Sequence, residues 1–131
     1  EVLAAFDRAP QSYALAKALA RFADPSMLAP MRRHLLAGHA HAAMVLAKLG
    51  AVSLPAFKAA LQSPRVAVRN AASFFLFNGE GSPAVRKIAD EELLHLLDTL
   101  AQHDPNGTVR LHARAAARRI RHPRTWAHLD K

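Results

Sequence analysis

Eight histidines and ten carboxylates are the side chains of this sequence that could hold a metal ion or transfer a proton. Glu92 and His95 stand three residues apart, the spacing that puts two ligands on one face of a helix. A carboxylate-bridged metal site needs at least two such elements, and the sequence contains one. His39 and His41 are two residues apart, so a helix would point them to different sides. We therefore expect no metal ion and no cofactor.

Motifs for covalent or phosphate chemistry are absent from the sequence as well. It has no cysteine, and it contains no nucleophile motif, no glycine-rich phosphate loop and no His-Glu-x-x-His element. No convergent acid–base set can be recognised, so we identify no catalytic residue. We expect a protein that binds a partner rather than an enzyme, and we keep a lyase-like or base-excising enzyme as an alternative.

The basic residues are concentrated near the C-terminus. Lys and Arg number 18 and Asp and Glu number 10, which gives a formal net charge of +8. Residues 110–131 hold seven basic residues and one acidic residue, so they carry +6 and leave +2 for residues 1–109. Guanidinium groups bind phosphate and carboxylate through paired hydrogen bonds. The charge therefore favours an acidic peptide or a nucleic acid, although six acids in residues 80–104 oppose the latter.

The last basic stretch also contains the single tryptophan. Residues 118–126 interleave four arginines with Trp126, and an indole ring can stack on a nucleic-acid base. Alternatively, Trp126 packs back over the preceding helix, as large aromatic side chains mostly do. In that case the arginines only solvate the exposed end of the fold.

Helices must position these side chains. Alanine is frequent and β-branched residues are few, which favours helix over sheet. Ser or Asp before Pro is typical of a helix start, because the side chain accepts from free N–H groups and Pro has none to lose. Gly38, Gly50 and Gly79 are expected to end helices, where a positive φ is needed. The four candidate starts are Asp24-Pro25, Ser63-Pro64, Ser82-Pro83 and Asp104-Pro105.

Apolar residues recur every three or four positions between these marks, as in Leu93, Leu97 and Leu100. The periodicity predicts roughly eight helices and a short extra turn at 83–88. Asp90 is expected to cap the helix that follows the turn. The predicted helices span about residues 1–7, 11–22, 26–36, 39–49, 54–61, 64–78, 91–101 and 106–121.

Part of the sequence repeats. Residues 68–76 align with residues 109–117, and both segments begin with Val-Arg. Residues 42–50 form a third copy, in which Ala43 matches Ala72. Ala40, three residues before Ala43, stands where the other two copies have arginine.

From residue 43 to residue 79 the sequence resembles the HEAT-like repeats first named from phycobilisome lyases. The shared pattern is Ala-Ala, Leu and Leu-Gly, then Leu, a polar loop with Pro, Val-Arg and Ala-Ala. The resemblance covers roughly residues 25–121. It implies an all-α fold, an α-α superhelix or solenoid of about four helix pairs, forming a single domain over residues 1–131.

The same resemblance implies that the second helix of each pair lines a concave face. Side chains that flank the core stripe of these helices would then bind a partner, with Lys17 and Arg21 extending the row. Arg69 and Arg110 are expected instead to join neighbouring repeats through an acidic partner. Phe74 and Phe77 point away from the core stripe, so either they are exposed or they pack on a neighbouring helix. The predicted partner-binding residues are Met44, Lys48, Ser73, Phe77, Arg114, Arg118 and Arg121.

The family spans scaffolds, chromophore lyases, DNA glycosylase relatives and a metal hydroxylase, so the resemblance implies a fold more than a function. We expect a protein–protein interaction scaffold for an acidic or amphipathic partner, with nucleic-acid binding through residues 110–126 as the alternative. No apolar run approaches the ~20 residues of a membrane helix, so we expect no membrane partner and a cytoplasmic location. The Ala- and Arg-rich composition suggests a bacterial source, and the chain can equally be one piece of a longer protein.

Overall fold

The structure, a computed structural model, describes the backbone of residues 1–78 and 82–122 and all their side chains except those of Ser82 and Pro83. Within these ranges the chain forms nine α-helices, two short 3₁₀ helices and no strand, so the predicted all-α fold is confirmed. The helices are α1 (Val2–Arg8), α2 (Tyr13–Arg21), η1 (Pro25–Met27), α3 (Leu28–Leu36), α4 (Ala42–Lys48), η2 (Gly50–Ser53), α5 (Leu54–Leu61), α6 (Val66–Phe77), α7 (Ser82–Ile88), α8 (Glu91–His103) and α9 (Gly107–Arg121).

The helices expected from the periodicity are all present in the described ranges. The segment predicted as a short turn is the seven-residue helix α7. Asp90 caps α8 as expected, because its Oδ1 accepts a hydrogen bond from the Leu93 N–H at 2.9 Å. Gly38 (φ +95°) and Gly50 (φ +80°) follow α3 and α4 in the left-handed region that favours glycine. Gly79 lies outside the described residues.

Two of the four predicted helix starts are displaced by a short loop. The N-caps of α6 and α9 are Arg65 and Asn106, each one residue after the proline. Ser63 accepts a hydrogen bond from the Arg65 N–H at 3.2 Å, and Asp104 accepts one from the Asn106 N–H at 2.9 Å. These bonds fold the loop before the helix begins, which is the usual role of Ser and Asp in turns.

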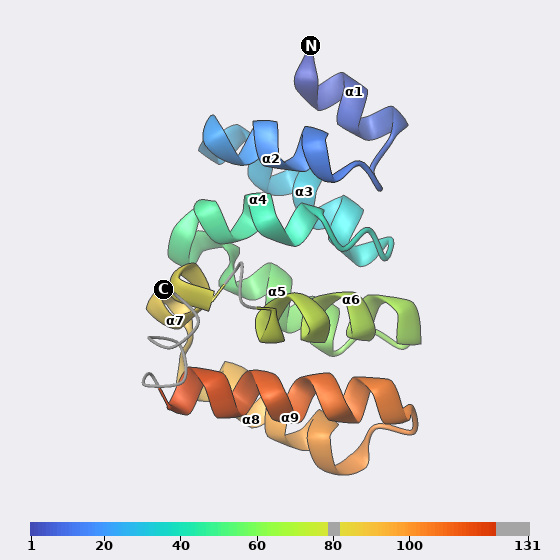
Figure 1. Ribbon diagram of the computed structural model, residues 1–131, viewed down its shortest axis with the longest axis vertical. Helices are drawn as coiled ribbons and strands as arrows, with labels where there is room; N and C mark the ends of the chain where they lie inside the picture. The colour runs from blue at the N-terminus through green and yellow to red at the C-terminus, as the bar shows by residue number, and fades with distance from the viewer. Residues whose placement is uncertain (79–81, 123–131) are drawn as a thin grey trace.

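The helices lie across the long axis of the molecule, one above another, from α1 at one end to α8 and α9 at the other (Figure 1). One side is formed by α2, α4, α6 and α9, while α3, α5 and α8 lie behind them. Contacts run along each side, α2 with α4 and α6 with α9 on the first, α3 with α5 and α5 with α8 on the second. The pairs α3–α4, α5–α6 and α8–α9 join the two sides.

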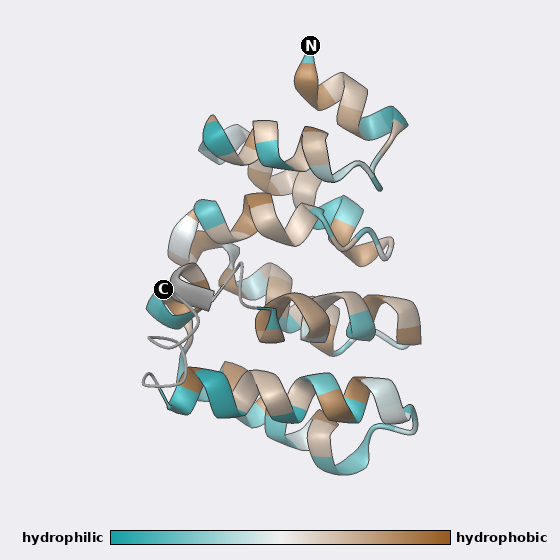
Figure 2. Ribbon diagram, in the orientation of Figure 1, coloured by the Kyte–Doolittle hydropathy of each residue, from teal (hydrophilic) through white to brown (hydrophobic). Residues whose placement is uncertain are grey.

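A single hydrophobic core runs between the two sides. Ala43, Ala72 and Ala113 occupy equivalent positions of α4, α6 and α9 and are all fully buried, and such small side chains let helices approach closely. Phe57 of α5 stacks on Phe75 of α6, with 5.9 Å between the ring centroids. Hydrophilic residues gather mainly in the loops and at helix ends (Figure 2). The core is therefore continuous along the described part of the chain.

One buried ion pair joins the α5–α6 pair to the α8–α9 pair. Arg69 Nε donates to Asp104 Oδ2 at 2.6 Å and Nη2 donates to Oδ1 at 3.2 Å, and the Asp104 side chain is 1 % exposed. Arg69 Nη1 donates to the Ser63 carbonyl at 3.0 Å, so one guanidinium holds two loops. Burial would raise the pKa of Asp104, but hydrogen bonds from Arg69 and the Asn106 N–H lower it overall. Arg69 thus has the acidic partner that the sequence analysis expects.

Arg110 makes only half of this arrangement. Its Nη1 donates to the Asp104 carbonyl at 2.6 Å, six residues earlier in the chain, just as Arg69 donates to the Ser63 carbonyl. No carboxylate of the described residues forms an ion pair with Arg110. The expected acidic partner is therefore found for Arg69 and, in the described part of the chain, not for Arg110.

We expect Asp104→Asn to lower the free energy of unfolding by about 3 kcal/mol, because it leaves the Arg69 guanidinium buried without its counter-charge. Urea denaturation followed by circular dichroism measures the loss. The matched control is Asp98→Asn, which breaks an exposed ion pair with Arg121 and should cost less than about 1 kcal/mol. Equal losses in the two variants would contradict the structural role of Asp104.

Stability should also fall as the pH drops below the ordinary histidine pKa of 6.5. Burial lowers the pKa of His112, and burial with the nearby charges of His34 and Arg65 lowers the pKa of His39. The unfolded chain then takes up protons before the folded chain does. The contribution of these two histidines to the free energy of unfolding is therefore fully present above pH 6.5 and decreases as the pH falls below it. An unchanged melting temperature between about pH 7.5 and pH 5 would show that these histidines are not shielded.

Candidate functional site

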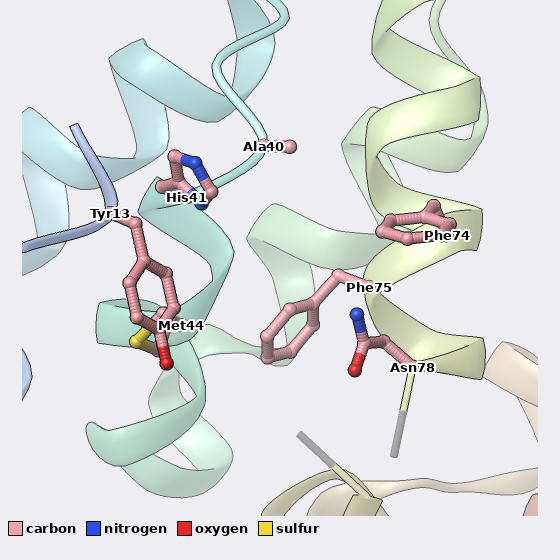
Figure 3. A pocket seen from close by; sticks show the side chains of 7 residues that line it. All are labelled: Tyr13, Ala40, His41, Met44, Phe74, Phe75 and Asn78. Carbon is pink, nitrogen blue, oxygen red and sulfur yellow. The ribbon is translucent and has the colours of Figure 1, made fainter. Parts of the chain in front are cut away.

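A crevice opens between α4 and α6 and encloses a cavity of about 230 Å³ (Figure 3). Helix α4 forms one wall and α6 forms the other, while a tyrosine from the start of α2 stands at the edge. The lining residues are Tyr13, Ala40, His41, Met44, Phe74, Phe75 and Asn78.

The crevice lies beside a repeat position that has no arginine to bind the neighbouring helix pair. Ala40 occupies the position that Arg69 and Arg110 occupy in the other two copies, and it lines the cavity. A methyl group cannot reach a carboxylate in the next loop as Arg69 reaches Asp104. At this position α4 and α6 also meet over a small contact, whereas α6 and α9 pack together extensively.

Aromatic rings form much of the wall of this cavity. Tyr13 and His41 meet edge to face, with 5.7 Å between their ring centroids. Phe75 stacks on the fully buried Phe57, so its ring is supported from behind. Tyr13 and Phe74 are 40 % and 41 % exposed. Together these rings offer an apolar surface that could bury a side chain from a partner.

Three cations adjoin the crevice. Met44 lines a second hollow, of about 470 Å³, together with Lys17, Ala20, Arg21 and Lys48. None of these three cations forms an ion pair with a described residue, and α2, α4 and α6 contain no acidic residue. We name this surface the α4 groove, defined as the seven crevice residues with Lys17, Arg21 and Lys48. Its positive charge is available to attract carboxylates.

Met44 and Lys48, two of the predicted partner-binding residues, lie in the α4 groove. Ser73 does not lie on any exposed surface, because it is 0 % exposed and its hydroxyl donates to the Arg69 carbonyl at 2.7 Å. The expectation that Ser73 binds a partner is therefore corrected: α6 is packed between other helices at this position, and Ser73 belongs to the core.

The two phenylalanines left open by the sequence analysis have different environments. Phe77, the last residue of α6, is half-buried against α9. Its ring stacks on His112 with 5.7 Å between ring centroids, and the Arg119 guanidinium lies over it, 4.7 Å from its centroid. Phe74 also touches the edge of His112, at 5.1 Å, but remains open to the crevice. Phe77 therefore packs α6 against α9. Of these two phenylalanines, Phe74 is the one that a partner can reach.

The predicted arginines lie on a separate surface from the α4 groove. Arg114 and Arg118 are exposed on the outer side of α9 and line a hollow of about 300 Å³. Arg121 is held by Asp98 through two hydrogen bonds of 2.8 and 2.6 Å. Thus the single continuous row of partner-binding residues expected from the sequence is divided in two. Trp126 lies outside the described residues.

In residues 1–78 and 82–122 no group of three or more histidines and carboxylates could hold a metal ion, and Glu92 pairs with Lys58 at 2.6 Å. No helix within these ranges is both long enough and apolar enough to cross a membrane.

No family model, no curated protein and no solved structure matches this chain.

Tyr13 and His41 line the crevice but are not among the partner-binding residues predicted from the sequence. Both come from the ends of their elements, where helical periodicity says little about direction. The available signal was Ala40, because the missing arginine at this repeat position indicates a weaker link to the next helix pair.

The contrast between Ser73 and its repeat equivalent Arg114 can be tested by exchange. Ser73→Arg should lower the free energy of unfolding by about 3 kcal/mol or more, because it forces an unpaired charge into the core. Arg114→Ser removes an exposed charge and should change it by less than about 0.5 kcal/mol. Chemical denaturation checks both values, and a fully stable Ser73→Arg protein would refute the packing of α6.

Proposed function

We propose that this protein is an interaction scaffold whose α4 groove binds an acidic, amphipathic segment of another protein. One observation carries this proposal. Met44 lines both the aromatic-walled cavity and the hollow that holds Lys17, Arg21 and Lys48, and these three cations have no carboxylate partner among the described residues. An apolar cavity beside such cations favours a ligand that has one large apolar side chain and nearby carboxylates.

We also propose that the helix pairs are repeats of a HEAT-like superhelix, with α2, α4, α6 and α9 as the second helices. Supporting this, Arg69 and Arg110 each donate to the carbonyl six residues earlier. The buried alanines Ala43, Ala72 and Ala113 recur at one register position. In such a superhelix the α4 groove would open on the face shared by the second helices.

Binding would combine two contributions. A large apolar side chain of the ligand enters the cavity between Tyr13 and Phe75, and its burial supplies most of the affinity. Carboxylates of the ligand lie over Lys17, Arg21 and Lys48, which steers the approach and fixes the register. Because Phe75 is already supported by Phe57, the scaffold loses little conformational freedom on binding.

Nucleic-acid binding through the basic end has weaker support. Arg110, Arg114, Arg119 and Arg121 all donate hydrogen bonds to protein groups. A phosphate contact at any of them would compete with those bonds, and of the arginines of α9 this leaves Arg118, which is exposed.

The proposal can be tested by selecting ligands from a display library of random peptides and measuring their dissociation constants by fluorescence anisotropy. Selected peptides should carry acidic residues around one aromatic or large aliphatic residue. Tyr13→Ala and Lys48→Glu should each weaken binding by roughly tenfold or more, because they remove a wall and a counter-charge. The matched control is Arg32→Glu, which reverses an exposed charge on α3, outside the groove, and should leave the dissociation constant unchanged.

Equal binding by all three variants, with melting temperatures unchanged, would overturn the assignment of the α4 groove. Binding of a generic DNA duplex tests the nucleic-acid alternative. Tight binding at low salt that falls steeply with added salt, and that Arg118→Glu abolishes while Lys48→Glu does not, would establish the nucleic-acid alternative instead.

A further inference from the structure

The outer face of α9 has an equivalent on α6 that is already covered. In the repeat register, residue n of α6 corresponds to residue n + 41 of α9, as Arg69 corresponds to Arg110. The α6 positions that meet α9 and its preceding loop include Arg69, Asn70 and Phe77. Asn70 Oδ1 lies 3.0 Å from His112 Nδ1, and Phe77 stacks on the same imidazole. This α6 surface is therefore an interface between helix pairs.

The equivalent positions of α9 are open. Leu111, which corresponds to Asn70, is 60 % exposed. Leu111, Ala115 and Arg118, the equivalents of Asn70, Phe74 and Phe77, line one hollow together with Arg114 and Arg119. Arg118 forms no ion pair with any residue in the described ranges. The hollow is thus the counterpart of the α6 surface on which α9 packs.

Arg110 supplies the second observation. Arg69 binds its own loop through the Ser63 carbonyl and the next loop through the Asp104 carboxylate. Arg110 makes the first of these two contacts, with the Asp104 carbonyl, and it forms no ion pair with a carboxylate of the described residues. The group that is missing is a carboxylate in the loop of another helix pair.

We infer that the outer face of α9, formed by Arg110, Leu111, Arg114, Ala115 and Arg118, docks a helical hairpin from another protein whose loop carries a carboxylate. The hairpin's second helix lies beside α9 as α9 lies beside α6, and its loop carboxylate binds Arg110. Arg114 and Arg118 require further acids on that helix. A second copy of this chain in a two-fold arrangement would bring arginines against arginines, since α9 contains no acid.

The test builds such a hairpin in register by inserting a copy of residues 81–121 between Arg121 and His122. The copied His112 and Arg119 are each changed to Glu, because these are the positions of α9 that meet Phe77, the equivalent of Arg118. The insert should fold, raise the melting temperature of the chain by several degrees and unfold in the same transition. Arg110→Ala in the parent part and Asp→Asn at the copied Asp104 should be coupled by roughly tenfold in the unfolding equilibrium constant. The cycle between Arg69 and Asp104 in the unmodified chain gives the reference value.

Additive effects of Arg110→Ala and the copied Asp→Asn would overturn the inference, as would an insert that leaves amide exchange in α9 at the rate of the unmodified chain. Leu111→Asp should remove the gain in melting temperature without changing the unmodified chain, because Leu111 is already exposed there. Sedimentation of the unmodified chain distinguishes another protein from a second copy of this chain as the occupant of the face. A dimer that Leu111→Asp dissociates would show that the face binds a second copy, which would contradict the inference. None of these changes touches the α4 groove, so peptide binding there should persist throughout.

Discussion

One arginine position governs how the helix pairs of this protein meet. At Arg69 the interaction is complete, because the guanidinium binds the carbonyl of its own loop and the buried carboxylate of Asp104 in the next. Removal of two charges from water is costly, and the cost is offset only when the geometry satisfies both partners. Here the bidentate contact does so, since Asp104 also accepts the Asn106 N–H. The ion pair therefore sets the position of α8 and α9 on α6.

The same position explains the two surfaces at which the packing is not closed. Ala40 cannot reach a neighbouring loop, and it lines the aromatic-walled cavity between α4 and α6. Arg110 reaches its own loop only, and the face of α9 beside it stays open. The two open surfaces therefore lie beside the two aligned segments that lack the complete Arg69–Asp104 arrangement, while Ala43, Ala72 and Ala113 are buried alike in all three.

Charge is segregated from this core in a way that suits a binding role. The helices that frame the α4 groove contain lysine and arginine and no acid. Three of the four acids of α8 and its N-cap form ion pairs instead, Asp90 and Glu92 with Lys58 and Asp98 with Arg121. Lys17, Arg21 and Lys48, in contrast, form no ion pair with a described residue and lie beside the cavity. A ligand with carboxylates can therefore bind without breaking an ion pair of the described structure.

The sequence by itself determined the helices and much of their punctuation. Apolar spacing, the cap at Asp90 and the glycines at 38 and 50 act within a few residues, so they can be recognised without knowing the neighbours. The resemblance to HEAT-like repeats implied an acidic partner for both Arg69 and Arg110, which the described structure shows for Arg69 alone. Only the tertiary structure decided which flanking side chains face solvent. Ser73 and Arg114 share one register position, yet Ser73 is covered where the helices continue and Arg114 is open, because burial depends on what packs against a helix and not on the helix alone.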